Sequence, residues 1–152
     1  MIMPINSLAE LKAAAGREIA VSDWIEITQE RINQFADATG DHQWIHVDRA
    51  RAERESPYGS TIAHGFLTLS LVPMFLMEAI QLGDVRMAIN YGLNRVRFPS
   101  AVRSGDRVRA RLAVQSTRDL EDATEAIFSV TIETKGSEKP CCVAEIITRQ
   151  YK

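Results

Sequence analysis

The sequence predicts an α+β fold in which one apolar helix packs against an antiparallel sheet. Residues 65–82 are apolar on nearly every side of a helical projection, so we expect a buried helix there, with Pro73 kinking it or removing one hydrogen bond. The chain beyond this helix has four runs rich in β-branched residues, joined by short turns that favour antiparallel neighbours. A sheet that curls around the helix would cover all of its sides. The four predicted strands span residues 85–98, 106–117, 123–134 and 141–150.

The first part of the chain is predicted to be mainly helical. Each of three helices follows a residue whose side chain can cap its first N–H groups. Residues 23–27 alternate as a short strand, and residues 40–48 are predicted to form a loop after a helix end. The caps and helices are Ser7 with residues 8–15, Thr28 with a helix that Gly40 ends, and Asp48 with a short charged helix through Glu55.

Length and composition favour one domain over residues 1–152, with a real hydrophobic core. The formal charge of −2 gives no reason to expect binding to nucleic acid or to a membrane surface. We expect neither a signal peptide nor a membrane-spanning helix. The two cysteines, Cys141 and Cys142, are adjacent, which disfavours a disulfide between them and matches no metal-ligand spacing. A reduced, cytoplasmic setting is the expectation.

The predicted loop at residues 40–48 carries the first candidate functional pair, Asp41 and His46. Two such groups in one short loop can face the same pocket, hold a water and exchange its proton. The alternative is structural: Asp41 caps a turn and His46 is a half-buried histidine. Spacing alone favours this alternative.

A second candidate is His64-Gly65 at the start of the apolar helix. Gly65 allows close approach to the backbone, and a free N–H at a helix start can stabilise an oxyanion. Alternatively, the two residues only shape a tight entry into the helix. Ser70 lies within the helix, where its hydroxyl either bonds back to a carbonyl one turn earlier or touches a ligand.

These residues resemble the MaoC-like family of (R)-specific enoyl-CoA hydratases and dehydratases. In that family a Gly-Asp opens a loop and a His follows five positions after the Asp, which here gives Asp41 and His46. A His-Gly then starts the central helix with a Ser six residues after the His, which here gives His64, Gly65 and Ser70.

Two further features bear on the resemblance. Phe98-Pro99, followed by Gly105-Asp106, resembles the family's turn between sheet strands. The chain departs from the common motif at Gln43-Trp44, where the family has Asn-Pro, and this variant resembles a nodulation-protein-N-like branch.

The resemblance implies a hot-dog fold, a homodimer, and a pantetheine tunnel between the helix and the partner subunit. It implies no metal and no redox cofactor. The implied reaction is hydration of a trans-2-enoyl thioester to a 3-hydroxyacyl thioester, or the reverse, on coenzyme A or acyl carrier protein. Asp41 and His46 are then the catalytic residues, and Gly65, His64 and Ser70 bind substrate.

Two other functions remain open for a chain of this kind. A hot-dog thioesterase would direct water to the carbonyl carbon, which the Asp–His motif argues against. A non-catalytic acyl-thioester-binding subunit would keep the fold without turnover, and the presence of both Asp41 and His46 argues against that.

Overall fold

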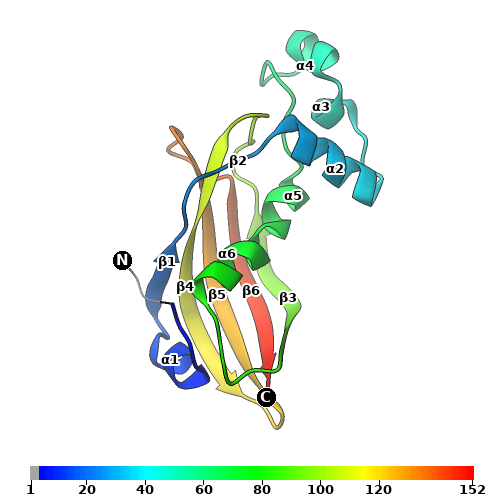
Figure 1. Cartoon of the computed structure of the whole chain (residues 1–152). Helices are drawn as coiled ribbons and strands as arrows, with labels where there is room; N and C mark the ends of the chain where they lie inside the picture. The colour runs from blue at the N-terminus through cyan, green and yellow to red at the C-terminus, as the bar shows by residue number, and fades with distance from the viewer. Residues whose placement is uncertain (1–3) are drawn as a thin grey trace.

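The computed structural model describes residues 4–152, and its centre is an antiparallel sheet of six strands (Figure 1). The strand order is β1-β4-β5-β6-β3, and β2 pairs with β4 beside β1. Every pair of neighbours is antiparallel, as the short connections predict. The strands are β1 (Arg17–Val21), β2 (Ile25–Glu26), β3 (Met87–Arg97), β4 (Arg107–Asp119), β5 (Ala123–Thr134) and β6 (Cys142–Tyr151).

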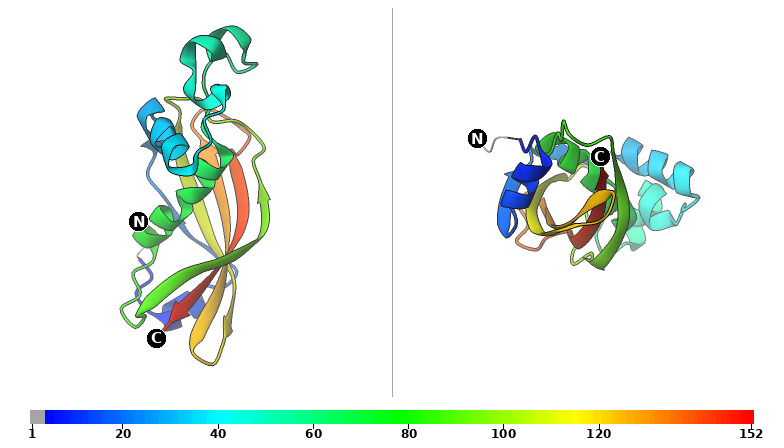
Figure 2. Two further views of the ribbon diagram at one scale, coloured as in Figure 1. Left: turned by 90° about the vertical axis from the view of Figure 1, so that its right-hand side faces the viewer. Right: turned by 90° about the horizontal axis from the view of Figure 1, so that it is seen from below.

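Within residues 4–152, six helices accompany the sheet. Two of them, α5 and α6, cross its concave face, and three others gather at one end of it (Figures 1 and 2). The expected α+β architecture, a central helical segment packed on a curled antiparallel sheet, is confirmed. The helices are α1 (Leu8–Ala13), α2 (Gln29–Thr39), α3 (Trp44–Val47), α4 (Arg49–Glu55), α5 (Gly65–Ser70) and α6 (Val72–Ala79).

The central helix is not continuous from residue 65 to 82 as expected. It breaks at Leu71, whose N–H bonds three residues back to Thr68 O (3.2 Å), and regular bonding resumes at Phe75 N to Leu71 O (3.3 Å). Pro73 accounts for the break because it lacks an N–H for the next helical bond and is tolerated only near a helix start, where it lies in α6. α6 ends at Ala79 because Ile80 becomes extended and bridges to Ile5.

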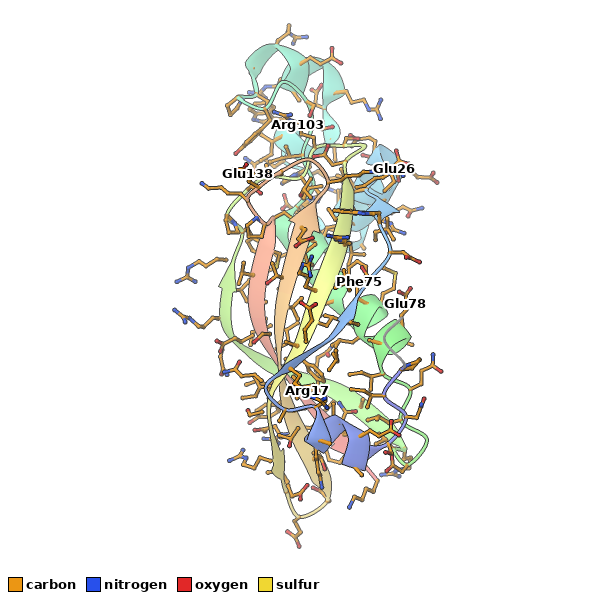
Figure 3. The ribbon with its side chains drawn as sticks, turned by 90° about the vertical axis from the view of Figure 1, so that its left-hand side faces the viewer. Arg17, Glu26, Phe75, Glu78, Arg103 and Glu138 are labelled. Carbon is orange, nitrogen blue, oxygen red and sulfur yellow. The ribbon has the colours of Figure 1, made fainter. Side chains whose placement is uncertain are left out.

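The expectation that this helix is buried on all sides is also wrong for the single chain. Leu67, Val72 and Phe75 are buried, and Phe75 points to the sheet beside β1 (Figure 3). In contrast, Phe66 is 69% and Met77 is 72% exposed. One sheet covers only one side of a helix, so an apolar stripe of the helix is left open.

Local capping positions the helices that precede α5. Thr28 Oγ accepts a hydrogen bond from Arg31 N (3.1 Å), and Asp48 accepts one from Arg51 N (3.0 Å), as predicted. Gly40 ends α2 in the left-handed conformation, with φ of +80°. The segment expected to be a loop after Gly40 contains one further helical turn, α3.

Three smaller expectations differ from the structure. The first helix ends at Ala13 rather than at residue 15, and the strand expected at residues 23–27 contains only Ile25–Glu26. β1, for which no strand was expected, pairs with β4 through a bulge. Cys141 and Cys142 are buried and free, and within residues 4–152 no helix has the length and apolarity to span a bilayer.

Candidate active site

Three of the candidate side chains meet at the end of the molecule where α2, α3 and the start of α5 come together (Figure 1). Asp41 follows the left-handed Gly40, His46 lies in α3, and His64 is the residue before α5. One polar atom from each residue lies within 4.8 Å of the others. The structure therefore brings Asp41, His46 and His64 around one small space.

His46 is buried and held by its ring. Its Nδ1 lies 2.7 Å from the carbonyl oxygen of Ile62. A carbonyl can only accept, so Nδ1 carries the proton, and Nε2 of the neutral ring keeps a free lone pair. Burial lowers the pKa of His46 below 6.5, the bond to Ile62 opposes this shift, and neighbouring His64 adds to it. His46 is therefore neutral near pH 7, with Nε2 ready to accept a proton.

His64 lies directly against His46. The two rings stack with centroids 3.8 Å apart and planes 22° apart. Phe35 also packs on the His64 ring, with 4.9 Å between the two ring centroids. His64 Nε2 donates to the backbone carbonyl of Asp41 (3.0 Å) and lies 3.9 Å from the Asp41 carboxylate. His64 thus fixes the position of the Asp41 backbone.

Asp41 forms the open side of the site. Its side chain is 52% exposed, and Oδ1 accepts a long hydrogen bond from Gln43 N (3.3 Å). Asp41 faces solvent, whereas His46 is enclosed. Their polar atoms lie close together, so a carboxylate and an imidazole nitrogen face the same space. Both groups accept hydrogen bonds, so one water placed between them can donate one hydrogen to each.

Two roles were predicted for Gly65: shaping the entry into the helix and offering its N–H to a ligand. A Cβ at this position would lie 2.8 Å from the Phe98 ring, so only glycine fits beneath that ring. This contact gives Gly65 a structural role in the entry to α5. Within residues 4–152, the Gly65 N–H has no hydrogen-bond acceptor, and its binding of a ligand stays a prediction.

The Ser70 side chain makes no hydrogen bond to Asp41, His46 or His64. Its hydroxyl donates back to Phe66 O (2.6 Å), which is the structural alternative for this residue. It also borders a groove of about 310 Å³ between α5 and β3, together with Leu69, Pro73 and Leu93. A ligand contact by Ser70 stays a prediction.

Two buried polar residues of the site were missed by the sequence analysis. Gln29 Nε2 donates to the carbonyl of His46 (2.7 Å), and Thr61 Oγ donates to Gln29 Oε1. A signal existed for Gln29, because it lies on the same helical stripe as the buried Ile32 and Ala36. A polar residue on such a stripe needs a buried partner.

The cluster also has the composition of a metal site with two histidines and one carboxylate. Four-coordinate zinc needs ligand lone pairs that converge at about 109°. The rings of His46 and His64 are stacked with planes 22° apart, so their in-plane lone pairs lie in nearly parallel planes, and Nδ1 of His46 is already bonded to Ile62. This geometry suits a shared water better than a metal ion.

Comparison with known proteins places the chain in a family. The family model described as "MaoC like domain" matches residues 10–135. The chain is 54% identical over 145 residues to 3-hydroxyacyl-thioester dehydratase Z of Mycobacterium tuberculosis, covering 95% of both chains. It is 44% identical to nodulation protein N of Rhizobium meliloti, covering 93% of this chain and 89% of that one.

A solved structure supports the fold. The R-hydratase PhaJ1 of Pseudomonas aeruginosa superposes with a TM-score of 0.73 over 91% of this chain and 82% of that chain, at 21% identity. Similarity at this level of identity shows the fold, and it agrees with the hot-dog architecture expected from the sequence. The extent of the family match and the identity to full-length relatives show that the chain belongs to the MaoC-like dehydratase family.

Proposed function

We propose that this protein is a hydro-lyase that interconverts trans-2-enoyl and (R)-3-hydroxyacyl thioesters, with Asp41 and His46 as its catalytic residues. The observation that carries the proposal is a neutral His46 whose free Nε2 shares one space with the Asp41 carboxylate. Family membership supports the reaction class, since the relative from Mycobacterium tuberculosis is named a 3-hydroxyacyl-thioester dehydratase.

The proposed mechanism uses one water between the two side chains. In hydration, His46 Nε2 takes a proton from the water as its oxygen attacks the β-carbon. The imidazolium then returns this proton to the α-carbon on the same face. Asp41 accepts a hydrogen bond from the second hydrogen of the water, orients it, and stabilises the transient imidazolium. Dehydration reverses these steps, so His46 removes the α-proton and protonates the departing hydroxyl.

The thioester carbonyl needs a donor while negative charge builds on its oxygen. In the proposal, the Gly65 N–H supplies this hydrogen bond, because it has no acceptor within the described chain and immediately follows His64. This placement leaves the β-carbon facing Asp41 and His46. The acyl carrier is coenzyme A or acyl carrier protein.

Crotonyl-CoA is the substrate for the test. Asp41→Asn and His46→Gln should each lower hydration by about 10²–10⁴-fold, because each loses a proton-handling group. The two losses should not multiply in the double variant, since both residues hold the same water. His42→Gln is the matched control: His42 is exposed, bonded to Asp37 (2.8 Å), and should retain near-parental turnover.

Three results would contradict the proposal. Near-parental turnover in both Asp41→Asn and His46→Gln would remove the catalytic assignment. Loss of activity only together with loss of folding, followed by circular dichroism, would return both residues to a structural role. Release of free coenzyme A without a hydroxyacyl product would instead identify a thioesterase.

We also propose that the protein is a homodimer. Within the described chain, β3 pairs only with β6, so its outer edge offers unpaired backbone groups. Exposed apolar side chains adjoin this edge, including Tyr91 and Leu93 on β3 and Met77 on α6. Antiparallel pairing of two β3 strands satisfies twofold symmetry, and the second copy would cover the apolar side chains that the sheet leaves open.

A further inference from the structure

A buried amide, Gln29, lies between the two chain segments that hold His46. It is the first residue of α2 and is 9% exposed. Its Nε2 donates to the backbone carbonyl of His46 (2.7 Å) and to Asn33 Oδ1 (2.9 Å). Its Oε1 accepts from the hydroxyl of Thr61, which is 2% exposed. The amide thus uses both of its N–H donors and its oxygen within the protein.

These partners define which way the amide faces. The carbonyl of His46 can only accept a hydrogen bond, so the nitrogen of Gln29 must face it. The Thr61 hydroxyl then donates to the oxygen on the other side. A reversed amide would place two acceptors together at His46, which is costly in a buried setting.

The hydrogen bonds form a closed circuit that contains the His46 ring. Gln29 bonds the carbonyl of His46, the ring of His46 bonds the carbonyl of Ile62, and Thr61, the neighbour of Ile62, bonds back to Gln29. A fourth bond, Ile62 N to Ile45 O (3.0 Å), ties the same two segments. The distance from His46 Nδ1 to the carbonyl oxygen of Ile62 therefore depends on the bonds that Nε2 and Oε1 of the Gln29 amide make.

We propose that Gln29, oriented by Thr61, is a positioning residue that holds His46 in the tautomer with a free Nε2. Its effect on turnover rests on the proposed function, whereas its effect on the tautomer does not. Without the amide, the short α3 turn and the segment around Ile62 separate by small amounts. The ring then loses its fixed acceptor and exchanges between tautomers.

The experiment compares three isosteric or near-isosteric variants. Gln29→Met and Thr61→Val remove the two ends of the amide bridge, and Thr61→Ser keeps the hydroxyl. Thr124→Val is the matched control, because Thr124 is fully buried and its hydroxyl also donates to a side-chain oxygen, Asp119 Oδ1 (3.1 Å), far from the site. All four variants are followed by thermal unfolding.

The first readout is nitrogen-15 NMR of labelled histidine, with His46 assigned through His46→Gln. The parent, Thr61→Ser and Thr124→Val should show the Nδ1–H form of His46, and Gln29→Met and Thr61→Val should show a mixture of tautomers. The second readout is crotonyl-CoA hydration, where Gln29→Met should lower kcat by about tenfold or more with KM nearly unchanged, as expected from a misplaced catalytic group.

The outcomes separate the two proposals. An unchanged His46 tautomer in Gln29→Met, or an equal loss of kcat in Thr124→Val, would overturn the positioning role. If the parent does not hydrate crotonyl-CoA, the proposed function fails on that substrate, and the NMR comparison still decides the role of Gln29.

Discussion

The contact between Gly65 and Phe98 gives a quantitative test of how closely the start of α5 packs against the Phe98 ring. A methyl group at residue 65 would lie 2.8 Å from Phe98 Cδ2 and 2.9 Å from Cγ. Cγ is the base of the ring and cannot move without the whole side chain. Gly65→Ala should therefore push Phe98 or the start of α5 out of place.

The magnitude follows from two opposing effects. Overpacking of this kind costs about 1–3 kcal/mol, and replacing a helical glycine by alanine returns at most about 1 kcal/mol. We expect Gly65→Ala to lower the free energy of unfolding by about 1–2 kcal/mol. Phe98 is 39% exposed, so the fold covers the other 61%, and Phe98→Ala should cost about 1–2 kcal/mol by lost burial.

The double variant tests the reasoning. With the Phe98 ring removed, Gly65→Ala meets no obstacle and should cost about 0 kcal/mol, giving a coupling energy of about 1–2 kcal/mol. Urea unfolding at one fixed protein concentration measures all four species. Gly83→Ala is the control, since its methyl group would meet nothing closer than Asn6 O at 3.9 Å. Equal costs of Gly65→Ala with and without Phe98 would refute the steric argument.

Four further predictions concern the site and the assembly. Hydration should be constant near pH 7 and fall as pH drops through the lowered pKa of His46, because the imidazolium cannot accept a proton; an inflection above 6.5 would contradict the lowered pKa. The same shift has a stability consequence: the unfolded chain binds a proton that folded His46 resists, so its contribution to stability is complete above pH 6.5 and declines as pH falls below that value. Dialysis against a chelator should leave turnover unchanged, and loss that zinc restores would favour the metal site that Asp41, His46 and His64 resemble. Light scattering should give twice the 17.0 kDa chain mass for the parent and a single-chain mass for Leu93→Glu, which buries a charge in the proposed interface; a parent mass of 17.0 kDa would contradict the dimer.

The elements predicted best from the sequence are those determined by residues that lie close together along the chain. The bounds of β5 agree with the expectation, because the strand is rich in β-branched residues and turn signals lie on both sides of it. The caps Ser7, Thr28 and Asp48 bond N–H groups three residues further along the chain, so spacing alone reveals them. Short connections likewise required antiparallel neighbours.

Elements that depend on distant partners were less predictable. β1 is a strand because residues 17–21 pair with β4, almost a hundred residues later. The end of α6 is set by Ile5, which bridges to Ile80. The exposed stripe of α5 and α6 looks like core in the sequence, since apolar side chains do not reveal whether the sheet or another chain covers them.

The candidate site shows the same division. Asp41 and His46 are five residues apart, so their proximity was predictable, and the motif added His64. Gln29 was not recognised, because its main partner is a backbone carbonyl, which every residue possesses. Sequence patterns reveal charged and aromatic groups well, but they do not show which buried carbonyl a neutral amide will reach.

The location of these contacts explains how a sheet-based fold supports the proposed chemistry. The segment from Thr61 to Ala63 is bonded to the loop before β4, through Ala63 N to Val102 O (2.7 Å) and Ser104 N to Thr61 O (3.0 Å). On its other side, the same segment holds α3 and the ring of His46. One extended segment thus fixes the position of His46 relative to the sheet, while Asp41 remains open to solvent. This arrangement fixes the proposed proton acceptor firmly and leaves the water-binding side accessible to substrate.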